Sequence, residues 1–434
     1  MSAAATATRR LLRAPRAKRG APPVEYSIML TATLCLLAFG VVMVFSASST
    51  TSLLGESGDS AYYLKRTLIF GAFGLVALKV LSARGVAIVR PLTGALLGLS
   101  FVLLLVVHLP GFGVEANGAT RWIGLGPIQV QPAEVTKVAL ILYGAQLLST
   151  RPKITGELRL LVPYLAVAGT ACALIVFEPD LGSALIVAFS VTALLVAAGV
   201  KLRHLALIFG ALALLAALMI LIEPYRMARL TGFLSPAADA GGAGFQGIQA
   251  SIALGSGGFF GVGLGESVQK AFYLPEAHTD MIAAVIGEEL GLVGISLLIG
   301  LFGLFGYAGF RTVHRAKDRY QKLLAAGLTA MVLVQATLNL FAVMGLAPLT
   351  GVPLPFVSYG NSSLLVMLAS VGLLLNIASG RAAPMAKPKP TSRGARLRAI
   401  EGGRGRTNDK GRRGSGRNSR ARGAGAGRRR RATG

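Results

Sequence analysis

The sequence predicts an all-α integral membrane protein with about ten transmembrane helices and a large extracytoplasmic loop between the seventh and the eighth. Only 14% of the 434 residues are charged and 53% are hydrophobic, whereas roughly 25% of an average soluble domain is charged. The apolar residues also gather in runs long enough to cross a bilayer. These observations exclude a soluble enzyme, a disulfide-rich secreted domain and a fibrous protein.

The ten predicted spans follow from the length of these runs. A hydrocarbon core of about 30 Å requires roughly 20 apolar residues per helix. Eight spans approach this length without a charge, whereas the second contains Lys79 and the fourth contains Glu134 and Lys137, so these two have to tilt or border a protein-lined cavity. In chain order the spans are Ile28 to Ser46, Thr67 to Ala83, Pro91 to Val107, Pro132 to Leu148, Leu160 to Phe177, Leu181 to Val200, Leu205 to Ile222, Leu290 to Phe310, Leu323 to Leu346 and Leu354 to Ile377.

The distribution of Lys and Arg orients these spans. Before the C-terminal tail, 19 basic residues fall on the side of the termini and 7 on the opposite side or its margins. Cytoplasmic connections carry the excess of Lys and Arg, so both termini are expected in the cytoplasm. The chain then divides into a basic cytoplasmic arm (1–26), a polytopic membrane domain (27–379) with an outward loop (223–280), and a cytoplasmic tail (380–434).

The tail from Arg381 to the end contains 18 basic and 2 acidic residues, mostly among Gly, Ala and Ser. A segment so poor in apolar side chains is expected to be disordered. It is either a solvated topogenic flank or a binding segment for anionic lipid or an acidic cytoplasmic partner. Without aromatic residues to stack on bases, it is not expected to bind nucleic acid.

Charged residues near membrane depth are the candidates for function, because each costs about 2.5 to 3.5 kcal/mol on insertion. They gather on the outward side, so we expect a site that opens away from the cytoplasm. Three alternatives stay open: Glu134 and Lys137 could neutralise each other on one helix face, Asp280 could only cap the following helix, and His278 could be an ordinary interfacial histidine. The outward candidates are Arg121, Glu134, Lys137, Glu178, Asp180, Glu276, His278, Asp280, Glu288 and Glu289.

Eight short strings follow one another in a fixed order along the chain. They are Val44-Phe-Ser-Ala-Ser48, Gly118-Ala-Thr-Arg-Trp-Ile123, Gln131-Pro-Ala-Glu134 with Lys137, Glu178-Pro-Asp-Leu-Gly182, Gly263-Leu-Gly-Glu-Ser-Val-Gln-Lys270, Tyr273-Leu-Pro-Glu-Ala-His-Thr-Asp280, Gly287-Glu-Glu-Leu-Gly291 and Val352-Pro-Leu-Pro-Phe-Val-Ser-Tyr-Gly360. This ordered set resembles the SEDS family (shape, elongation, division, sporulation), and in particular its cell-division branch. The resemblance covers about Tyr26 to Ser379. It departs from the family pattern at Asn361, where a glycine is usual, and at Met281 and Ala283, where aromatic residues are common.

The resemblance implies a peptidoglycan glycosyltransferase that polymerises lipid II on the outer face of the cytoplasmic membrane, for septal wall synthesis. It makes Asp280 the catalytic base. One base suffices, because a lipid pyrophosphate leaves without needing a proton. Arg121, Lys137 and Lys270 are expected to offset the pyrophosphate charge. The residues expected to position substrate are Asp180, Glu276, His278, Ser358 and Ser362.

The implied partners are lipid II, a class B penicillin-binding transpeptidase and other division proteins. No metal-ligand spacing demands a cofactor, although a divalent cation such as Mg²⁺ could bridge diphosphate and carboxylate. Two other functions fit ten helices with intramembrane charges: a lipid II flippase or transporter, and a scaffold of the division machinery without enzymatic activity. Charges that crowd one face rather than the midplane count against transport.

Overall fold

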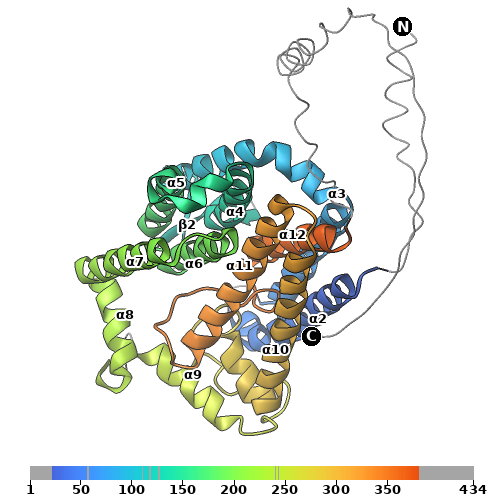
Figure 1. Ribbon diagram of the computed structural model, residues 1–434. Helices are drawn as coiled ribbons and strands as arrows, with labels where there is room; N and C mark the ends of the chain where they lie inside the picture. Colours follow the sequence, from blue (N-terminus) through green and yellow to red (C-terminus); the bar gives the residue numbers. More distant parts are fainter. Residues whose placement is uncertain are drawn as a thin grey trace, which may run out of the picture. The chain divides into compact units, whose positions relative to one another are not determined.

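Helices make up most of the regular structure in the computed structural model (Figure 1). The structure describes residues 22–55, 58–109, 111–116, 119–125, 128–239, 241–242 and 244–380. All of them belong to one compact unit. The tail and most of the basic arm lie outside the described residues, so the predictions made for them stay predictions.

Nine long helices contain the ten predicted spans, because the second and third spans fall in one helix. Eight of these helices are long and apolar enough to cross a membrane, and the ninth, α4, carries the charged pair Glu134 and Lys137. The nine helices are α2 (Val24–Leu54), α3 (Tyr62–Val106), α4 (Pro132–Thr150), α5 (Leu158–Phe177), α6 (Leu181–Ala198), α7 (Leu202–Ile222), α10 (Ile282–Arg315), α11 (Arg319–Val343) and α12 (Asn361–Ala378).

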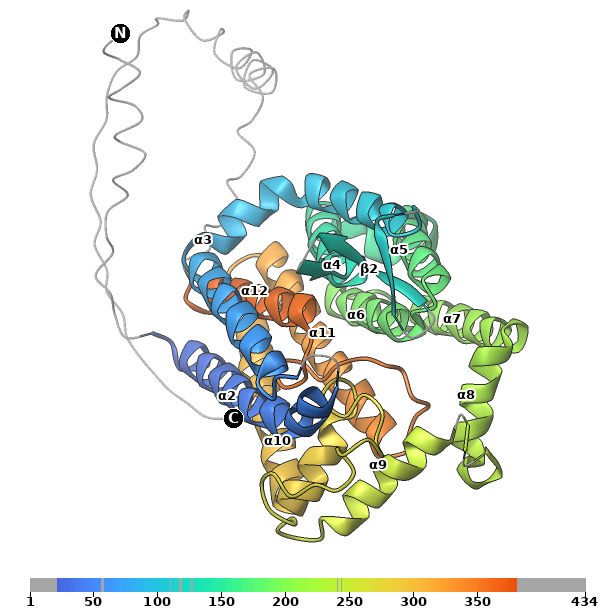
Figure 2. The same ribbon diagram turned by 180° about the vertical axis from the view of Figure 1, so that it is seen from behind.

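Helix α3 has 45 residues, about 67 Å if straight, which is too long for a single crossing. Figure 2 shows that it changes direction along its length. Near its middle the Asn376 side chain of α12 inserts: its Nδ2 donates to the carbonyl oxygen of Ser82 at 3.0 Å, and the backbone N–H of Val86 donates to its Oδ1 at 3.3 Å. These two backbone groups pair with each other in an ideal helix, so an inserted amide favours a bend there.

A small antiparallel sheet, which the sequence analysis did not predict, connects α3 to α4. Its strands are β1 (Gly113–Ala116), β2 (Ala119–Leu125) and β3 (Ile128–Val130), in the order β1-β2-β3. Val114 pairs with Trp122, and Gly124 pairs with Gln129. The sheet carries Arg121 on β2, toward the turn between α5 and α6.

The predicted loop at 223–280 is largely ordered. It contains α8 (Pro224–Leu234), the short 3₁₀ helix η2 (Pro236–Asp239) and α9 (Phe245–Ser256), followed by a run of turns to Met281. A second short 3₁₀ helix, η1 (Pro152–Gly156), connects α4 to α5.

The glycine-rich run in these turns is explained by close backbone contact with α10. Gly291 interrupts the helical geometry of α10 with a φ of 62°. A Cβ on Gly291 would lie 2.4 Å from the backbone nitrogen of Gly261, so no larger side chain fits. The N–H of Leu292 donates to the carbonyl of Gly258 at 3.1 Å across this contact.

The last predicted span begins later than expected. Residues 346–360 are non-helical and α12 begins at Asn361 rather than at Leu354. Pro353 and Pro355 cannot donate the backbone hydrogen bonds of a helix, which accounts for the difference. The main core lies around α11 and α12, whereas α7 buries only His204 and Leu205 and leaves its apolar surface exposed.

Candidate active site

Asp280 lies at the end of the turns that precede α10, and it is half-buried. Asn339 of α11 fixes its backbone, since the Asn339 Nδ2 donates to the carbonyl oxygens of both Asp280 and Val352, at 2.7 and 2.8 Å. Burial, followed by the negative charge of Glu276, raises the pKa of Asp280 to about 7, while the positive charge of Arg229 acts in the opposite direction. A carboxyl group with this pKa can take up a proton near neutral pH.

The alternative that Asp280 only caps a helix is not supported. Helix α10 begins at Ile282, its cap residue is Met281, and no side chain accepts a hydrogen bond from its first turn. By contrast, Asp180 is a true cap: its Oδ1 accepts from the Ser183 N–H at 2.9 Å at the start of α6.

Glu276 and His278 lie beside Asp280 on the same run of turns. Thr279 connects them, because its hydroxyl lies 2.7 Å from Oε2 of Glu276 and 3.3 Å from Oδ1 of Asp280. Glu276 is exposed. The His278 ring packs on Tyr63 with ring centroids 4.1 Å apart. Burial lowers the pKa of His278, while the negative charge of Glu276 acts in the opposite direction.

Two cavities flank α8 and share Arg229. The larger, of about 490 Å³, lies among α8, α9 and the residues that follow α11, and Pro275 also lines it. The smaller, of about 190 Å³, also contains Arg226 and Thr350. Both arginines were among the seven basic residues counted on the outward side or its margins, and neither was predicted as a site residue. Their place in the short helix α8 directly after the seventh span was the available signal.

An apolar groove of about 320 Å³ continues from the smaller cavity between α5, α6 and α7. The groove and the cavity share Leu181, Leu185 and Ala216. Arg226 stands at their junction, where it donates to the carbonyl oxygens of Val176 and Met219 at 3.1 and 3.2 Å. The positive charge of Arg226 therefore lies at one end of an apolar groove.

The two lysines predicted to hold pyrophosphate are both buried in ion pairs. Lys137 lies 2.9 Å from Glu134 and donates to Oε1 of Gln335 at 2.7 Å. Mutual neutralisation of Glu134 and Lys137, one of the two expectations for this pair, agrees with this geometry. Lys270 lies 2.8 Å from Glu289. Neither lysine lines the cavities around Arg229.

The consecutive carboxylates at the start of α10 point to different partners. Glu289 accepts from Lys270 and from the Ser46 hydroxyl of α2, at 2.8 and 2.7 Å. Glu288 accepts from the Ser267 hydroxyl, and from the Val268 N–H at 3.0 Å. Together they hold the turns that lead to Asp280 against α10.

Arg121 and Asp180 meet at the turn between α5 and α6. Arg121 donates to the carbonyl oxygens of Glu178 and Pro179 at 3.1 and 2.6 Å, and the second oxygen of Asp180 accepts from Gln131 at 2.9 Å. Burial, followed by the negative charge of Asp180, raises the pKa of Glu178 to about 9. Neither carboxyl oxygen of Glu178 has a hydrogen-bond partner among the described residues.

The two predicted serines are buried in backbone contacts. The Ser358 hydroxyl accepts from the Leu354 N–H at 2.8 Å and closes the turn before α12. The Ser362 hydroxyl donates to the Gln129 carbonyl at 3.1 Å and accepts from the Gln131 N–H at 3.2 Å, which joins α12 to β3. Within the described ranges, no three His, Cys, Asp or Glu side chains are grouped as a metal site would require.

The sequence matches one protein family and several named relatives. The family model for the cell cycle proteins FtsW, RodA and SpoVE matches residues 26–382. Over 362 residues the chain is 41% identical to the probable peptidoglycan glycosyltransferase FtsW of Trichlorobacter lovleyi, covering 82% of this chain and 94% of that protein. It is 39% identical over 352 residues to the stage V sporulation protein E of Bacillus subtilis, covering 81% and 96%.

Solved structures share the fold. One chain, from a study of polymerization and crosslinking by a peptidoglycan synthase complex, superimposes with a TM-score of 0.68 at 31% identity, covering 82% of this chain and 98% of that one. The rod shape determining protein RodA of Thermus thermophilus gives a TM-score of 0.60 at 29% identity, covering 82% and 97%.

Proposed function

The chain belongs to the SEDS family of FtsW, RodA and SpoVE, and from that premise we infer that it is a peptidoglycan glycosyltransferase. It is a multi-pass membrane protein of the cell cycle family and polymerises peptidoglycan, the activity that its relatives' names print. That this peptidoglycan is the wall of the division septum is part of the proposal. We propose that its substrate is lipid II and that it works with a penicillin-binding protein; this is supported by the likeness to a chain from a study of polymerization and crosslinking by a peptidoglycan synthase complex. That this partner is a transpeptidase of class B, acting with other division proteins, is part of the proposal.

One observation carries the proposed mechanism: a half-buried aspartate with a pKa of about 7 lies within electrostatic range of Arg229, which lines two cavities. Asp280 takes the proton from the acceptor sugar hydroxyl. The hydroxyl oxygen then attacks the anomeric carbon of the donor, and the bond from that carbon to the diphosphate breaks with inversion.

The remaining parts of the site have matching roles. Arg229 and Arg226 offset the charge that grows on the leaving diphosphate, and the apolar groove between α5, α6 and α7 receives the polyprenyl chain. Glu276 and His278 position the sugars. Lys137 and Lys270 act through the ion pairs that they form. Arg121 and Asp180 hold the turn between α5 and α6. Ser358 closes the turn before α12, and Ser362 joins the start of α12 to the sheet.

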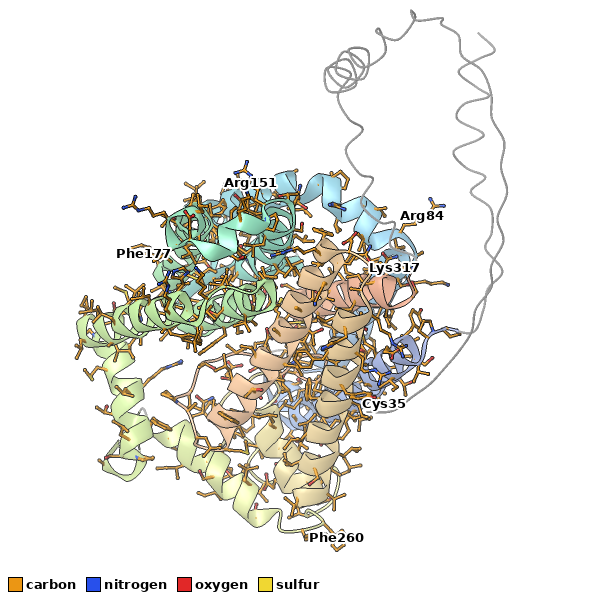
Figure 3. All side chains as sticks on the ribbon, viewed as in Figure 1. Cys35, Arg84, Arg151, Phe177, Phe260 and Lys317 are labelled. Atoms are coloured by element: carbon orange, nitrogen blue, oxygen red, sulfur yellow. The ribbon has the colours of Figure 1, made fainter. Side chains whose placement is uncertain are left out.

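The proposed topology places both termini in the cytoplasm and the segment 223–280 outside, at the division septum. The excess of Lys and Arg on the side of the termini, 19 residues against 7, supports this topology. In Figure 3, Arg84, Arg151 and Lys317, which were all assigned to the cytoplasmic side, lie well away from Phe260 of the outward segment. The site then faces the compartment in which the cell wall is built.

The test is to incubate the purified chain and its transpeptidase partner with lipid II in detergent. Glycan polymer should form, with one polyprenyl diphosphate released for each bond made. A mock purification from cells that lack the chain controls for contaminating polymerases. Absence of polymer with a partner that still crosslinks added glycan would contradict the enzyme and favour the scaffold; lipid II translocation in vesicles without polymer would favour the flippase.

A further inference from the structure

A third cavity, to which the mechanism above assigns no substrate group, borders the segment that leads to Asp280 and includes Glu276 and His278 in its lining. Its volume is about 680 Å³, within the range of small-molecule sites. It is formed by the end of α2, the start of α3 and the turns that precede Asp280. The lining residues are Thr51, Ser52, Gly55, Tyr62, Tyr63, Phe272, Leu274, Pro275, Glu276, Ala277 and His278.

Aromatic rings make up one wall of this cavity. Tyr63 is the centre of the cluster: its ring centroid lies 5.2 Å from that of Tyr62, 4.1 Å from that of His278 and 4.7 Å from that of Tyr359. Asn361, the residue that departs from the family pattern, donates to the Tyr359 hydroxyl at 3.2 Å. Rings that support one another present fixed faces with polar edges.

The opposite wall is held in an uncommon backbone conformation. Phe272 and Glu276 both have left-handed φ angles, of 68° and 55°, which cost a residue other than glycine about 1 to 3 kcal/mol and occur preferentially at functional sites. Both residues line the cavity. The surrounding contacts therefore maintain this wall against its local preference.

Asp280 follows a segment that borders both sides, because Pro275 lines both this cavity and the larger arginine cavity. The Thr279 hydroxyl lies 3.3 Å from Oδ1 of Asp280 and 2.7 Å from Oε2 of the cavity-lining Glu276. A Cβ on Gly351 would lie 3.9 Å from Oδ2 of Asp280. Gly351 follows Thr350, which lines the smaller arginine cavity. One carboxylate thus lies near residues of both regions, the one cationic and apolar, the other aromatic and hydroxyl-rich.

We propose that the aromatic cavity binds the terminal amino sugar of the acceptor lipid, with Tyr62 and Tyr63 as its platform, while the donor diphosphate occupies the side of Arg229. The assignment rests on the proposed function and deepens it. Pyranose rings offer C–H faces to aromatic rings and hydroxyls to Thr51 and Glu276. The lining residues include no Lys or Arg. The nearby Arg66 is engaged with the platform itself, since its guanidinium lies over the Tyr62 ring at 5.4 Å from the centroid and donates to the Tyr62 hydroxyl at 2.8 Å.

In this assignment, each bond that forms in the transfer is matched by a bond that breaks. The acceptor hydroxyl loses its proton to Asp280, its oxygen bonds to the anomeric carbon of the donor, and the carbon–oxygen bond to the diphosphate breaks. The bonding electrons leave with the polyprenyl diphosphate beside the arginines. Asp280 then returns its proton to water.

Two lipid II analogues isolate the two sides of the transfer. A fluorescent lipid II whose acceptor hydroxyl carries an extra sugar can only donate. A lipid II with a methylene group in place of the anomeric oxygen can only accept. With the donor saturating, the rate of labelled product is measured against acceptor concentration for the parent, Tyr63→Leu and Tyr62→Leu.

We expect each variant to raise the acceptor concentration that gives half the maximal rate roughly tenfold. A change of this size corresponds to the loss of about one aromatic contact. The maximal rate and the donor half-saturation should stay within about threefold of the parent values. Tyr307→Leu is the matched control, because Tyr307 is an exposed tyrosine near the other end of α10.

An unchanged acceptor half-saturation, or a shift confined to the donor, would overturn the assignment while leaving the proposed function intact. A parent that forms no labelled product would overturn both. If Tyr63→Leu does not fold, Tyr62→Leu decides, since its side chain is exposed and its truncation opens no core.

Discussion

Lys270→Met should strongly destabilise the protein, because it strands a buried charge. The Lys270 Nζ lies 2.8 Å from Glu289 Oε1, 2.7 Å from the Gly265 carbonyl oxygen and 3.2 Å from the Ser46 hydroxyl. Side-chain exposure is 5% for Lys270 and 0% for Glu289. Breaking a buried pair by removing one partner costs about 3 to 5 kcal/mol, whereas replacing both partners is often nearly neutral.

The assay is thermal or denaturant unfolding in detergent of the parent, Lys270→Met, Glu289→Gln and the double variant. The double variant should be at least about 2 kcal/mol more stable than the sum of the single losses predicts. Lys65→Met is the control: Lys65 lies 2.7 Å from Asp59, but the two side chains are 64% and 39% exposed, so the loss should stay below about 1 kcal/mol. Equal small losses at Lys270 and Lys65 would refute the claim that this pair holds the turns before Asp280.

Two other predictions concern the fold and the pH profile. Asn376→Leu should lower the free energy of unfolding by about 2 to 4 kcal/mol, because the Ser82 carbonyl and the Val86 N–H lose their side-chain partner near the bend of α3. A denaturant titration measures this loss, and a value below about 1 kcal/mol would contradict the role given to Asn376. Burial raises the pKa of Asp280 to about 7, and a base must be unprotonated, so the polymerisation rate should fall about tenfold per pH unit below 7; a flat rate between pH 5 and 7 would contradict the assignment.

Much of the fold could be predicted from the sequence because the bilayer imposes a simple rule on composition. Apolar length located the nine long helices, but not the shorter helices α8 and α9 or the small sheet. The change of direction within α3 could not be predicted, because the amide that inserts near its middle belongs to Asn376 of a helix almost 300 residues away. The start of α12 at Asn361 was not predicted, because the expected span was drawn from the apolar run that begins at Leu354. The prolines at 353 and 355, which disfavour a helix there, were given less weight than that run.

The candidate site was predictable where neighbours in sequence interact. The Glu134–Lys137 pair follows from i, i+3 spacing. The Lys270–Glu289 pair joins a turn to a helix and has no periodic signal, so Lys270 was expected to face the substrate instead. Arg229 was missed as a site residue for a related reason: only the packing of α8 beside the segment after α11 brings its charge near Asp280.

The polymerisation rate of Asp280→Asn, measured with lipid II and the transpeptidase partner, tests the central claim most directly. Asparagine keeps the shape of the side chain but cannot accept the proton, so we predict a rate roughly 10²- to 10⁴-fold below the parent, with unchanged unfolding temperature and lipid II binding. Asp318→Asn is the control, since both hydrogen bonds that the Asp318 carboxylate accepts come from Gln321 at the start of α11, from its N–H at 2.8 Å and from its Nε2 at 3.3 Å, and asparagine caps a helix as well as aspartate does. A parent-like rate for Asp280→Asn would contradict the assignment of Asp280 as the general base.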